Sequence, residues 1–208
     1  MMQKVTPCLW FDGQAEQAAR YYVSLLPDSR IDKVFRSPAD TPSGPAGMVL
    51  AVDFTLAGNR FSALNGGPQF PFTEAVSFAV MCDTQAEVDY YWEKLTADGG
   101  EPGVCSWLKD KFGLSWQVQP RLLIELLGDP DKAKAERVMN AMMKMTKIDV
   151  AALTGLTDAQ RNVLKTIYGE TKNKDGVIYP AQPFGGEGDA AGWPTWIVGV
   201  NPMMMTAQ

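Results

Sequence analysis

Two parts of the chain share one pattern of apolar and polar positions. Each part begins with an apolar run typical of a β-strand, Val5–Phe11 in the first and Val76–Cys82 in the second. After each run, apolar residues recur at i, i+3, i+4 and i+7, which predicts a helix with one face on a sheet. These residues are Ala18, Tyr21, Tyr22 and Leu25 in the first part, and Val88, Tyr91, Trp92 and Leu95 in the second. The sequence therefore predicts the same strand–helix unit twice.

The residues that open the two predicted helices are also similar. Asp12-Gly13-Gln14-Ala15-Glu16 recurs as Asp83-Thr84-Gln85-Ala86-Glu87. We expect Asp12 or Gly13 to cap the first helix, and Thr84 with Glu87 forms a capping-box motif at the second. The spacing between Asp12 and Asp83, where the two motifs start, is longer than the repeat of a solenoid protein. It indicates a duplicated half-domain instead. Two similar halves favour a ligand site on the seam between them.

Further strands complete each half. The pattern predicts strands at Arg30–Phe35, Met48–Leu56 and Arg60–Leu64 in the first half, and at Val104–Lys109 and Leu114–Gln119 in the second. The segment Ser37–Gly47 is rich in Pro and Gly and is predicted to be a loop. The order is β-α-β-β-β followed by β-α-β-β, which indicates an α+β fold.

The character of the sequence changes after Pro120. A short helix is predicted over Arg121–Leu127, followed by a longer helix that Asp129 caps. Beyond these, we expect a helix from Thr157 to Gly169, a turn at Lys172–Gly176 and the extended segment Val177-Ile178-Tyr179, before a stretch rich in Gly, Pro and Trp. No further copy of the repeat occurs there. We therefore predict one domain over residues 1–152 and an appended, irregular tail over residues 153–208.

The absence of histidine from all 208 residues restricts the possible chemistry most strongly. Without imidazole there is no Ser-His-Asp or Cys-His relay, and the commonest transition-metal ligand is missing. A net charge of −5, without a long Lys/Arg cluster, disfavours a nucleic-acid partner. No apolar stretch reaches about 18 residues, so we expect no membrane span. Three cysteines without C-x-x-C spacing are expected to be reduced thiols in the cytoplasm.

Several blocks of sequence resemble the PhnB-like branch of the vicinal oxygen chelate superfamily, which includes glyoxalase I, bleomycin-resistance proteins and extradiol dioxygenases. Members of this branch often carry the name 3-demethylubiquinone-9 3-methyltransferase. The blocks are Thr6–Glu16, Leu64–Pro68, Ser77-Phe78, Thr84–Asp89 and Trp107–Val118. The resemblance implies two βαβββ modules that form a curved, U-shaped mixed sheet, and a homodimer.

Metal-using relatives in this superfamily place His or Glu on the first strand of each module and on the last strands. The first strands here offer no His, Asp or Glu, and the late positions offer the amides of Asn65 and Gln117, which bind divalent metals weakly. We therefore expect neither a metal nor another cofactor. The methyltransferase name also lacks support, because no G-x-G-x-x-G loop follows a predicted strand.

The tail resembles a different family, the tannase/feruloyl esterases. The similar segments are Leu156–Gln160, Ile167–Gly169, Val177–Pro180 and Gly192-Trp193. In those enzymes this region implies the lid side of an α/β-hydrolase. The chain has no G-x-S-x-G motif, so esterase catalysis is not expected here. A natural gene fusion, a frameshift relic and a mis-joined gene all remain open as origins of the tail.

Candidate ligand-binding residues are aromatic or polar positions on the predicted strands. The aromatic candidates are Trp10, Phe54, Phe78, Trp107 and Trp116, and the polar candidates are Asn65, Lys109 and Gln117. The aromatic rings either pack in the core and at a dimer contact or line an apolar cavity within the curved sheet. Asn65 either belongs to a turn or anchors a ligand. Gln117 needs a polar partner in the protein or the ligand, since an unpaired buried amide costs about 1–3 kcal/mol.

The charged segment Lys109-Asp110-Lys111 is expected to be solvated, although Lys109 could instead reach an anionic group at a cavity mouth. Cys8 and Cys82 are expected to be small buried hydrophobic residues. These observations favour a metal-independent protein that binds a small apolar or aromatic molecule. The alternative is an enzyme on the same scaffold that acts on a small metabolite, with Asp53 or Glu74 as a general base.

Overall fold

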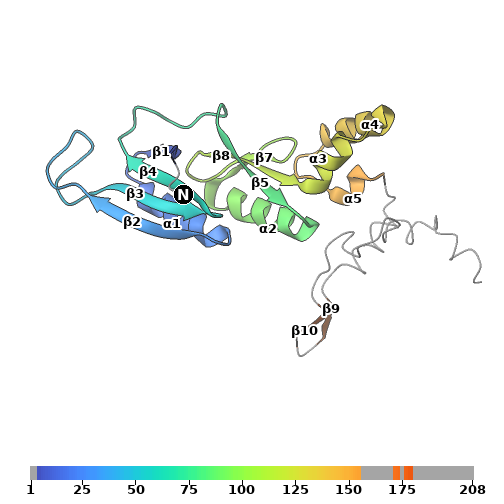
Figure 1. Ribbon diagram of the computed structural model, residues 1–208, viewed down its shortest axis with the longest axis horizontal. Coiled ribbons are helices and arrows are strands. Elements are labelled where there is room, and N and C mark those ends of the chain that lie inside the picture. The colour runs from blue at the N-terminus through green and yellow to red at the C-terminus, as the bar shows by residue number, and fades with distance from the viewer. Residues whose placement is uncertain (1–3, 156–170, 174–175, 180–208) are drawn as a thin grey trace, which may run out of the picture. The chain divides into compact units, whose positions relative to one another are not determined.

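The computed structural model describes residues 4–155, 171–173 and 176–179 of the chain (Figure 1). The first module contains β1 (Cys8–Phe11), α1 (Ala15–Leu25), β2 (Arg30–Arg36), β3 (Val49–Leu56) and β4 (Asn59–Asn65). The second contains β5 (Ser77–Cys82), α2 (Gln85–Thr96), the single 3₁₀ turn Ala97–Gly99, β6 (Glu101–Pro102), β7 (Trp107–Lys109) and β8 (Ser115–Pro120). Then follow α3 (Arg121–Leu127), α4 (Lys132–Met142), α5 (Val150–Leu153), β9 (Thr171–Asn173) and β10 (Gly176–Tyr179).

The strands of the two modules form sheets with the same order. The first is β1-β4-β3-β2 and the second is β5-β8-β7-β6. In the first sheet β1 runs parallel to β4, whereas β3 is antiparallel to both of its neighbours, so the sheet is mixed. The predicted α+β class and the duplicated βαβββ unit are confirmed. The second module has one strand more than the sequence pattern indicated, the short β6.

Contacts along the chain define two compact units. The first comprises Met1–Phe78, Glu93–Pro102 and Leu108–Gln117, and the second comprises Ala79–Trp92, Gly103–Trp107 and Val118–Gln208.

The core of the first unit lies between α1 and one face of its sheet. Val52, Phe54 and Ala63 are fully buried on that face, and Ala15, Ala18, Ala19 and Tyr22 are fully buried on the helix. The small alanine side chains let the helix backbone lie close to the strands. A series of aromatic rings extends this core, with centroids of neighbouring rings 5.1–5.9 Å apart in the order Phe54, Phe61, Phe78, Trp116, Tyr22 and Phe112.

The second unit joins α2 to the segment that precedes α5. The predicted capping box is confirmed, because the Glu87 backbone N–H donates to Thr84 Oγ1 and the Thr84 N–H donates to Glu87 Oε2. Gln85 donates to the Ile148 carbonyl and accepts from the Val150 N–H. A separate apolar cluster binds the helices together and consists of Leu123, Leu126, Val138, Ile148 and Leu153.

Three predicted boundaries at element starts are wrong. The first strand begins at Cys8 rather than at Val5, whose side chain is exposed. Neither Asp12 nor Gly13 caps α1. The N-cap is Gln14, which makes no side-chain cap, and the Ala15 N–H is satisfied by the Asn65 side chain on β4. The longer C-terminal helix is capped by Asp131 instead of Asp129.

The predicted strand Val104–Lys109 is wrong in its first half. Cys105 and Ser106 have φ angles of 55° and 60°, which are incompatible with an extended strand. The strand therefore begins only at Trp107. Hydrogen bonds from the Cys105 and Ser106 N–H groups to the Met145 and Thr146 carbonyls hold this unusual backbone.

Part of the predicted tail lies beyond the residues that the structure describes. This applies to the helix expected between Thr157 and Gly169, and to the segment after Tyr179. The extended segment Val177–Tyr179 falls within β10, which pairs antiparallel with β9. Among the helices of the described residues, none combines the length and the apolar character needed to cross a membrane.

Candidate functional site

The face of the first sheet opposite α1 carries a mixture of apolar and polar side chains. Side chains alternate between the two faces of a strand, so Asp53 points away from α1, while Val52 and Phe54 pack under it. Strand register places Cys8, Ser62, Asp53 and Lys33 in one row across the sheet, and Trp10, Leu64, Ala51 and Phe35 in the next. We call these eight residues the open face. Most of them are half-buried, which suits a surface that binds a small molecule.

Asp53 is flanked by groups that direct their donors elsewhere. The Ser62 hydroxyl donates a hydrogen bond to the Cys8 sulfur. The Lys33 Nζ lies 4.1 Å from the centroid of the Phe35 ring, in a cation–π contact. No ion pair within the described part of the chain involves Asp53. The carboxylate therefore has no ion-pair partner in its own row, and the adjoining row on the same face carries Arg30 and Arg60 on either side of Thr55.

The Cys8 thiol is exposed, which contradicts the prediction that it is a buried hydrophobic residue. Partial burial and the negative charge of Asp53 raise the pKa of Cys8, and the hydrogen bond from Ser62 offsets this in part. The thiol therefore stays protonated at neutral pH, and it is a poor nucleophile. Cys82, in contrast, is buried as predicted.

Trp10 is held in one orientation at the end of the open face. Its indole Nε1 donates to the Gly67 carbonyl over 2.7 Å, and its ring meets the edge of Phe70 at a centroid distance of 5.0 Å. A Cβ atom on Gly66 would lie 2.1 Å from Trp10 Cζ2, so only glycine fits beneath the indole. Trp10 is thus a fixed apolar surface at the Gly66–Phe70 end of the open face.

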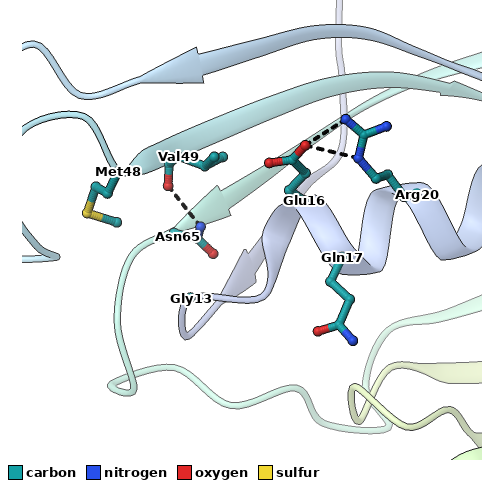
Figure 2. A pocket seen from close by; sticks show the side chains of 7 residues that line it. All are labelled: Gly13, Glu16, Gln17, Arg20, Met48, Val49 and Asn65. Carbon is teal, nitrogen blue, oxygen red and sulfur yellow. Dashed lines mark hydrogen bonds and ion pairs between the residues drawn. The ribbon is translucent and has the colours of Figure 1, made fainter.

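A hollow lies beside the N-terminus of α1, with a volume of about 550 Å³ (Figure 2). Its lining consists of Gly13, Glu16, Gln17, Arg20, Met48, Val49 and Asn65. Figure 2 shows its charged groups paired with each other, because Arg20 donates to Glu16 Oε1 through two nitrogens. The hollow therefore offers a ligand less free charge than the open face does.

Asn65, predicted as a turn residue or a ligand anchor, uses both ends of its amide within the first unit. Its Oδ1 accepts from the Ala15 N–H and its Nδ2 donates to the Val49 carbonyl, both over 2.9 Å. It caps α1 from a strand 50 residues further along the chain. This side chain is therefore primarily structural.

The structure disperses the other predicted ligand-binding residues. Phe54 and Trp116, considered as cavity lining or core, lie in the core, where they present no surface to a ligand. Phe78 lies between the Phe61 and Trp116 rings. Trp107 lies half-buried on β7, in the second unit. Of the predicted residues, only Trp10 and Asp53 share the open face.

The predicted polar residues of the second module have partners within the protein. Gln117 Nε2 donates to Ser77 Oγ over 2.8 Å. Lys109 and Glu74 form an ion pair. The hydrogen bond from Lys109 lowers the pKa of Glu74, which makes it a weaker base. Of the two predicted general bases, Asp53 is therefore better suited.

Asp110, expected to be solvated, is buried, with 2% of its surface exposed. Its Oδ2 accepts from the Tyr22 hydroxyl and from Trp116 Nε1, both over 2.8 Å, and its Oδ1 accepts from the N–H groups of Phe112 and Leu114. Burial raises the pKa of Asp110, and these four hydrogen bonds oppose the rise. The two backbone contacts could be predicted from the sequence, because an Asp at the start of a turn that ends in Gly113 commonly accepts hydrogen bonds from the N–H groups that follow it. Nothing local to the sequence signals the contact with Tyr22.

Donor groups for a metal ion do not converge in the residues that the structure describes. No set of three or more His, Cys, Asp or Glu side chains there is placed to hold a metal ion.

Comparison with known proteins connects the front of the chain to a family. The model of the 3-demethylubiquinone-9 3-methyltransferase family matches residues 3–119. A PhnB protein from Bacillus cereus is 36% identical over 57% of this chain and 99% of its own, with a TM-score of 0.52. No curated protein sequence matches.

Two further solved structures are similar at lower identity. Protein PA1353 from Pseudomonas aeruginosa is 18% identical over 57% of this chain and 98% of its own, with a TM-score of 0.47. A glyoxylase/bleomycin resistance protein/dioxygenase domain from Frankia sp. EAN1pec is 14% identical over 58% and 93%, with a TM-score of 0.37. These matches lend no support to the resemblance between the tail and tannase/feruloyl esterases.

Proposed function

Because this chain belongs to the 3-demethylubiquinone-9 3-methyltransferase family and has the fold of the PhnB protein from Bacillus cereus, we propose that it is a metal-independent protein that binds a small organic molecule on the open face. The observation that carries the proposal is the pairing of a half-buried carboxylate, Asp53, with the fixed ring of Trp10 on the same face. Small-molecule sites typically combine apolar surface with a few polar groups that orient the ligand.

The donor chemistry supports binding without a metal. The chain contains no histidine, and the first strands β1 and β5 offer only the thiols of Cys8 and Cys82 as metal ligands. Burial raises the pKa of Cys82 to about 12, and that of Cys8 is also raised, so both favour the protonated form that does not bind metals. The metal site of the superfamily therefore does not fit these residues.

An enzyme on the same scaffold is the second candidate. The observation in its favour is that the Asp53 carboxylate forms no ion pair in the described part of the chain, and a carboxylate can act as a general base toward a bound metabolite. The methyltransferase named by the family is a weaker form of this candidate, because the sequence lacks a glycine-rich dinucleotide-type loop after a strand. Turnover that is lost in Asp53→Asn while ligand binding persists would favour the enzyme.

A thermal-shift screen of small aromatic and apolar compounds tests the proposal. Each compound that raises the melting temperature is then tested for protection of Cys8 against alkylation, with Cys105 in the same molecule as the internal reference. Occupancy of the open face should slow modification of Cys8 alone. The Asp53→Asn variant should alter the response, and Glu93→Gln, which removes an exposed carboxylate on α2, should not.

Two outcomes would contradict the proposal. If no compound in the screen stabilised the protein, the proposed ligand-binding function would be wrong. Compounds that stabilise the protein without protecting Cys8 would place the ligand away from the open face, and the Gln117→Leu variant would then test the second module. The homodimer, the cytoplasmic location and the domain boundary at residues 152–153 stay predictions, and sedimentation equilibrium measures the first of them.

A further inference from the structure

We infer that the second sheet carries a further binding site, for a small molecule with a carboxylate group. The site consists of Ser77 on β5, Lys109 on β7, and Ser115 and Gln117 on β8, and we call these four residues the polar patch. All four lie in the first compact unit. None of them belongs to the open face, so the inference does not depend on ligand binding there.

The Ser115 hydroxyl is the observation that carries the inference. Ser115 is buried, with 1% of its surface exposed, and its Oγ has no hydrogen-bond partner among the residues that the structure describes. No other buried side-chain oxygen or nitrogen in that part of the chain lacks a partner. A hydroxyl is costly to bury unpaired, and a group in this state needs an explanation such as a bound water or a ligand.

Ser115 lies on the face of β8 that points away from the aromatic core. Side chains alternate along the strand, and the buried Trp116 packs against the Phe78 ring at a centroid distance of 5.3 Å. Ser115 and Gln117 therefore share the opposite face. Gln117 Nε2 donates to Ser77 Oγ over 2.8 Å, so β5 contributes a second hydroxyl to this face.

The register of the β7–β8 hairpin places a cation directly across from Ser115. The Asp110 N–H donates to the Leu114 carbonyl over 2.9 Å, and the next cross-strand pair is Lys109 with Ser115. Residues in such a pair share one face, with Cβ atoms about 4.5–5.5 Å apart. An ammonium group and an unpaired hydroxyl can both donate hydrogen bonds. Together they suit an anionic acceptor with two oxygens.

A carboxylate of the chain itself already contacts the ammonium group. Glu74, in the turn before β5, forms an ion pair with Lys109, and the two side chains are 63% and 36% exposed. Exposed ion pairs contribute little to stability, so a carboxylate from solution can replace Glu74 at small cost. The ligand would accept a charge-assisted hydrogen bond from Lys109 Nζ with one oxygen and a bond from Ser115 Oγ with the other. Because Ser115 is buried, the flexible Lys109 side chain must turn with its new partner to let the ligand reach the hydroxyl.

Benzoate, benzamide and acetate test the inference by calorimetry on the full chain. Benzamide has nearly the shape of benzoate without its charge, and acetate is the head group alone. The wild-type protein should bind benzoate about tenfold more tightly than benzamide, which corresponds to one charge-assisted interaction. Acetate should compete with benzoate. The net charge of −5 disfavours non-specific binding of anions, so binding that depends on Lys109 reports the polar patch.

Three variants give a pattern that only this site predicts. Lys109→Gln should abolish the preference for benzoate over benzamide, and Ser115→Ala should weaken benzoate binding about tenfold. Glu74→Gln should instead tighten it, because the competing carboxylate is gone. Two exposed residues elsewhere provide controls with the same charge changes, and Glu93→Gln and Lys144→Gln should leave the affinity for benzoate unchanged.

The melting temperature of Ser115→Ala provides a second readout that needs no ligand. It should lie above that of the wild-type protein, because the variant removes a buried hydroxyl without a partner. A lower melting temperature would show that the hydroxyl is already satisfied, and would overturn the inference.

Three binding results would also overturn it. These are no binding of benzoate or acetate, benzoate binding that persists in Lys109→Gln, and benzoate binding that Glu74→Gln leaves unchanged. Protection of Cys8 from alkylation by benzoate would place the anion on the open face instead. The function proposed above is tested separately, because it fails or holds on the protection of Cys8 and not on the polar patch.

Discussion

Replacing Asp110 with asparagine should destabilise the first unit strongly, although the two side chains have nearly the same shape. The Oδ2 atom of Asp110 accepts two hydrogen bonds, from Tyr22 and Trp116, and Oδ1 accepts two from backbone N–H groups. An asparagine has one oxygen, so whichever way the amide is turned, its NH₂ group faces two donors. Two buried donors then lose a charged acceptor.

The magnitude follows from those two lost contacts. Hydrogen bonds to charged groups contribute about 1.5–3 kcal/mol each, and relief from burying the charge of Asp110 offsets part of their loss. We expect the free energy of unfolding to fall by about 2–4 kcal/mol, because each buried donor left without an acceptor costs about 1–3 kcal/mol. Tyr22→Phe removes only one of the donors, and its loss should be about 1–2 kcal/mol.

Urea unfolding followed by tryptophan fluorescence measures both variants against the wild-type protein. The loss should also depend on pH. The pKa of Asp110 is raised in the folded protein, so its protonation stabilises the fold below its ordinary pKa of 3.8, and this contribution is lost as pH rises through the raised value. The wild-type protein should thus gain stability over Asp110→Asn on acidification. A loss below about 1 kcal/mol at neutral pH would refute the reasoning, since it would mean that the network contributes little.

Three further predictions concern local packing, a buried thiol and a helix cap. Gly66→Ala should displace the Trp10 ring, because the new Cβ would lie 2.1 Å from it, and should cost about 1–3 kcal/mol, seen as a lower melting temperature and altered tryptophan fluorescence. An unchanged spectrum would contradict this. The pKa of Cys82 is raised from 9.0 to about 12 in the folded protein. The stability gained by keeping this thiol protonated is therefore complete below pH 9 and is lost as pH rises toward 12. Mass spectrometry at pH 8 should find this thiol unalkylated in the folded protein. Glu87→Ala should remove the capping box with Thr84 and lower the free energy of unfolding by about 1 kcal/mol, measured by urea unfolding. An unchanged free energy of unfolding would show that the capping box does not stabilise α2.

The duplicated modules were predictable because their signals are local. The apolar spacing of α1 and α2 and the capping box at Thr84 depend on residues within one or two turns of each other. The break at Cys105 and Ser106 was not predictable in this way. Their left-handed backbone is held by carbonyl groups about 40 residues later, and neither residue type favours that conformation.

The candidate site was predictable only in part for the same reason. Trp10 was identified as a large aromatic residue on a predicted strand, and Asp53 because a carboxylate between apolar neighbours is unusual on a strand. The contributions of Cys8, Ser62 and Lys33 depend on how four strands align, and a shift of one residue would move each of them to the other face. Asn65 was identified as a polar residue of interest, but its partner, the Ala15 N–H, lies 50 residues earlier in the chain.

The cap that Asn65 provides to α1 has a consequence for how the first module forms. A helix that relies on a distant strand for its first turn cannot complete that turn before β4 is in place, so nucleation of α1 is coupled to the assembly of the sheet. The amide of Ala15 should then exchange with deuterium only when β4 separates from the sheet. Helix start and strand end would open together as one cooperative step.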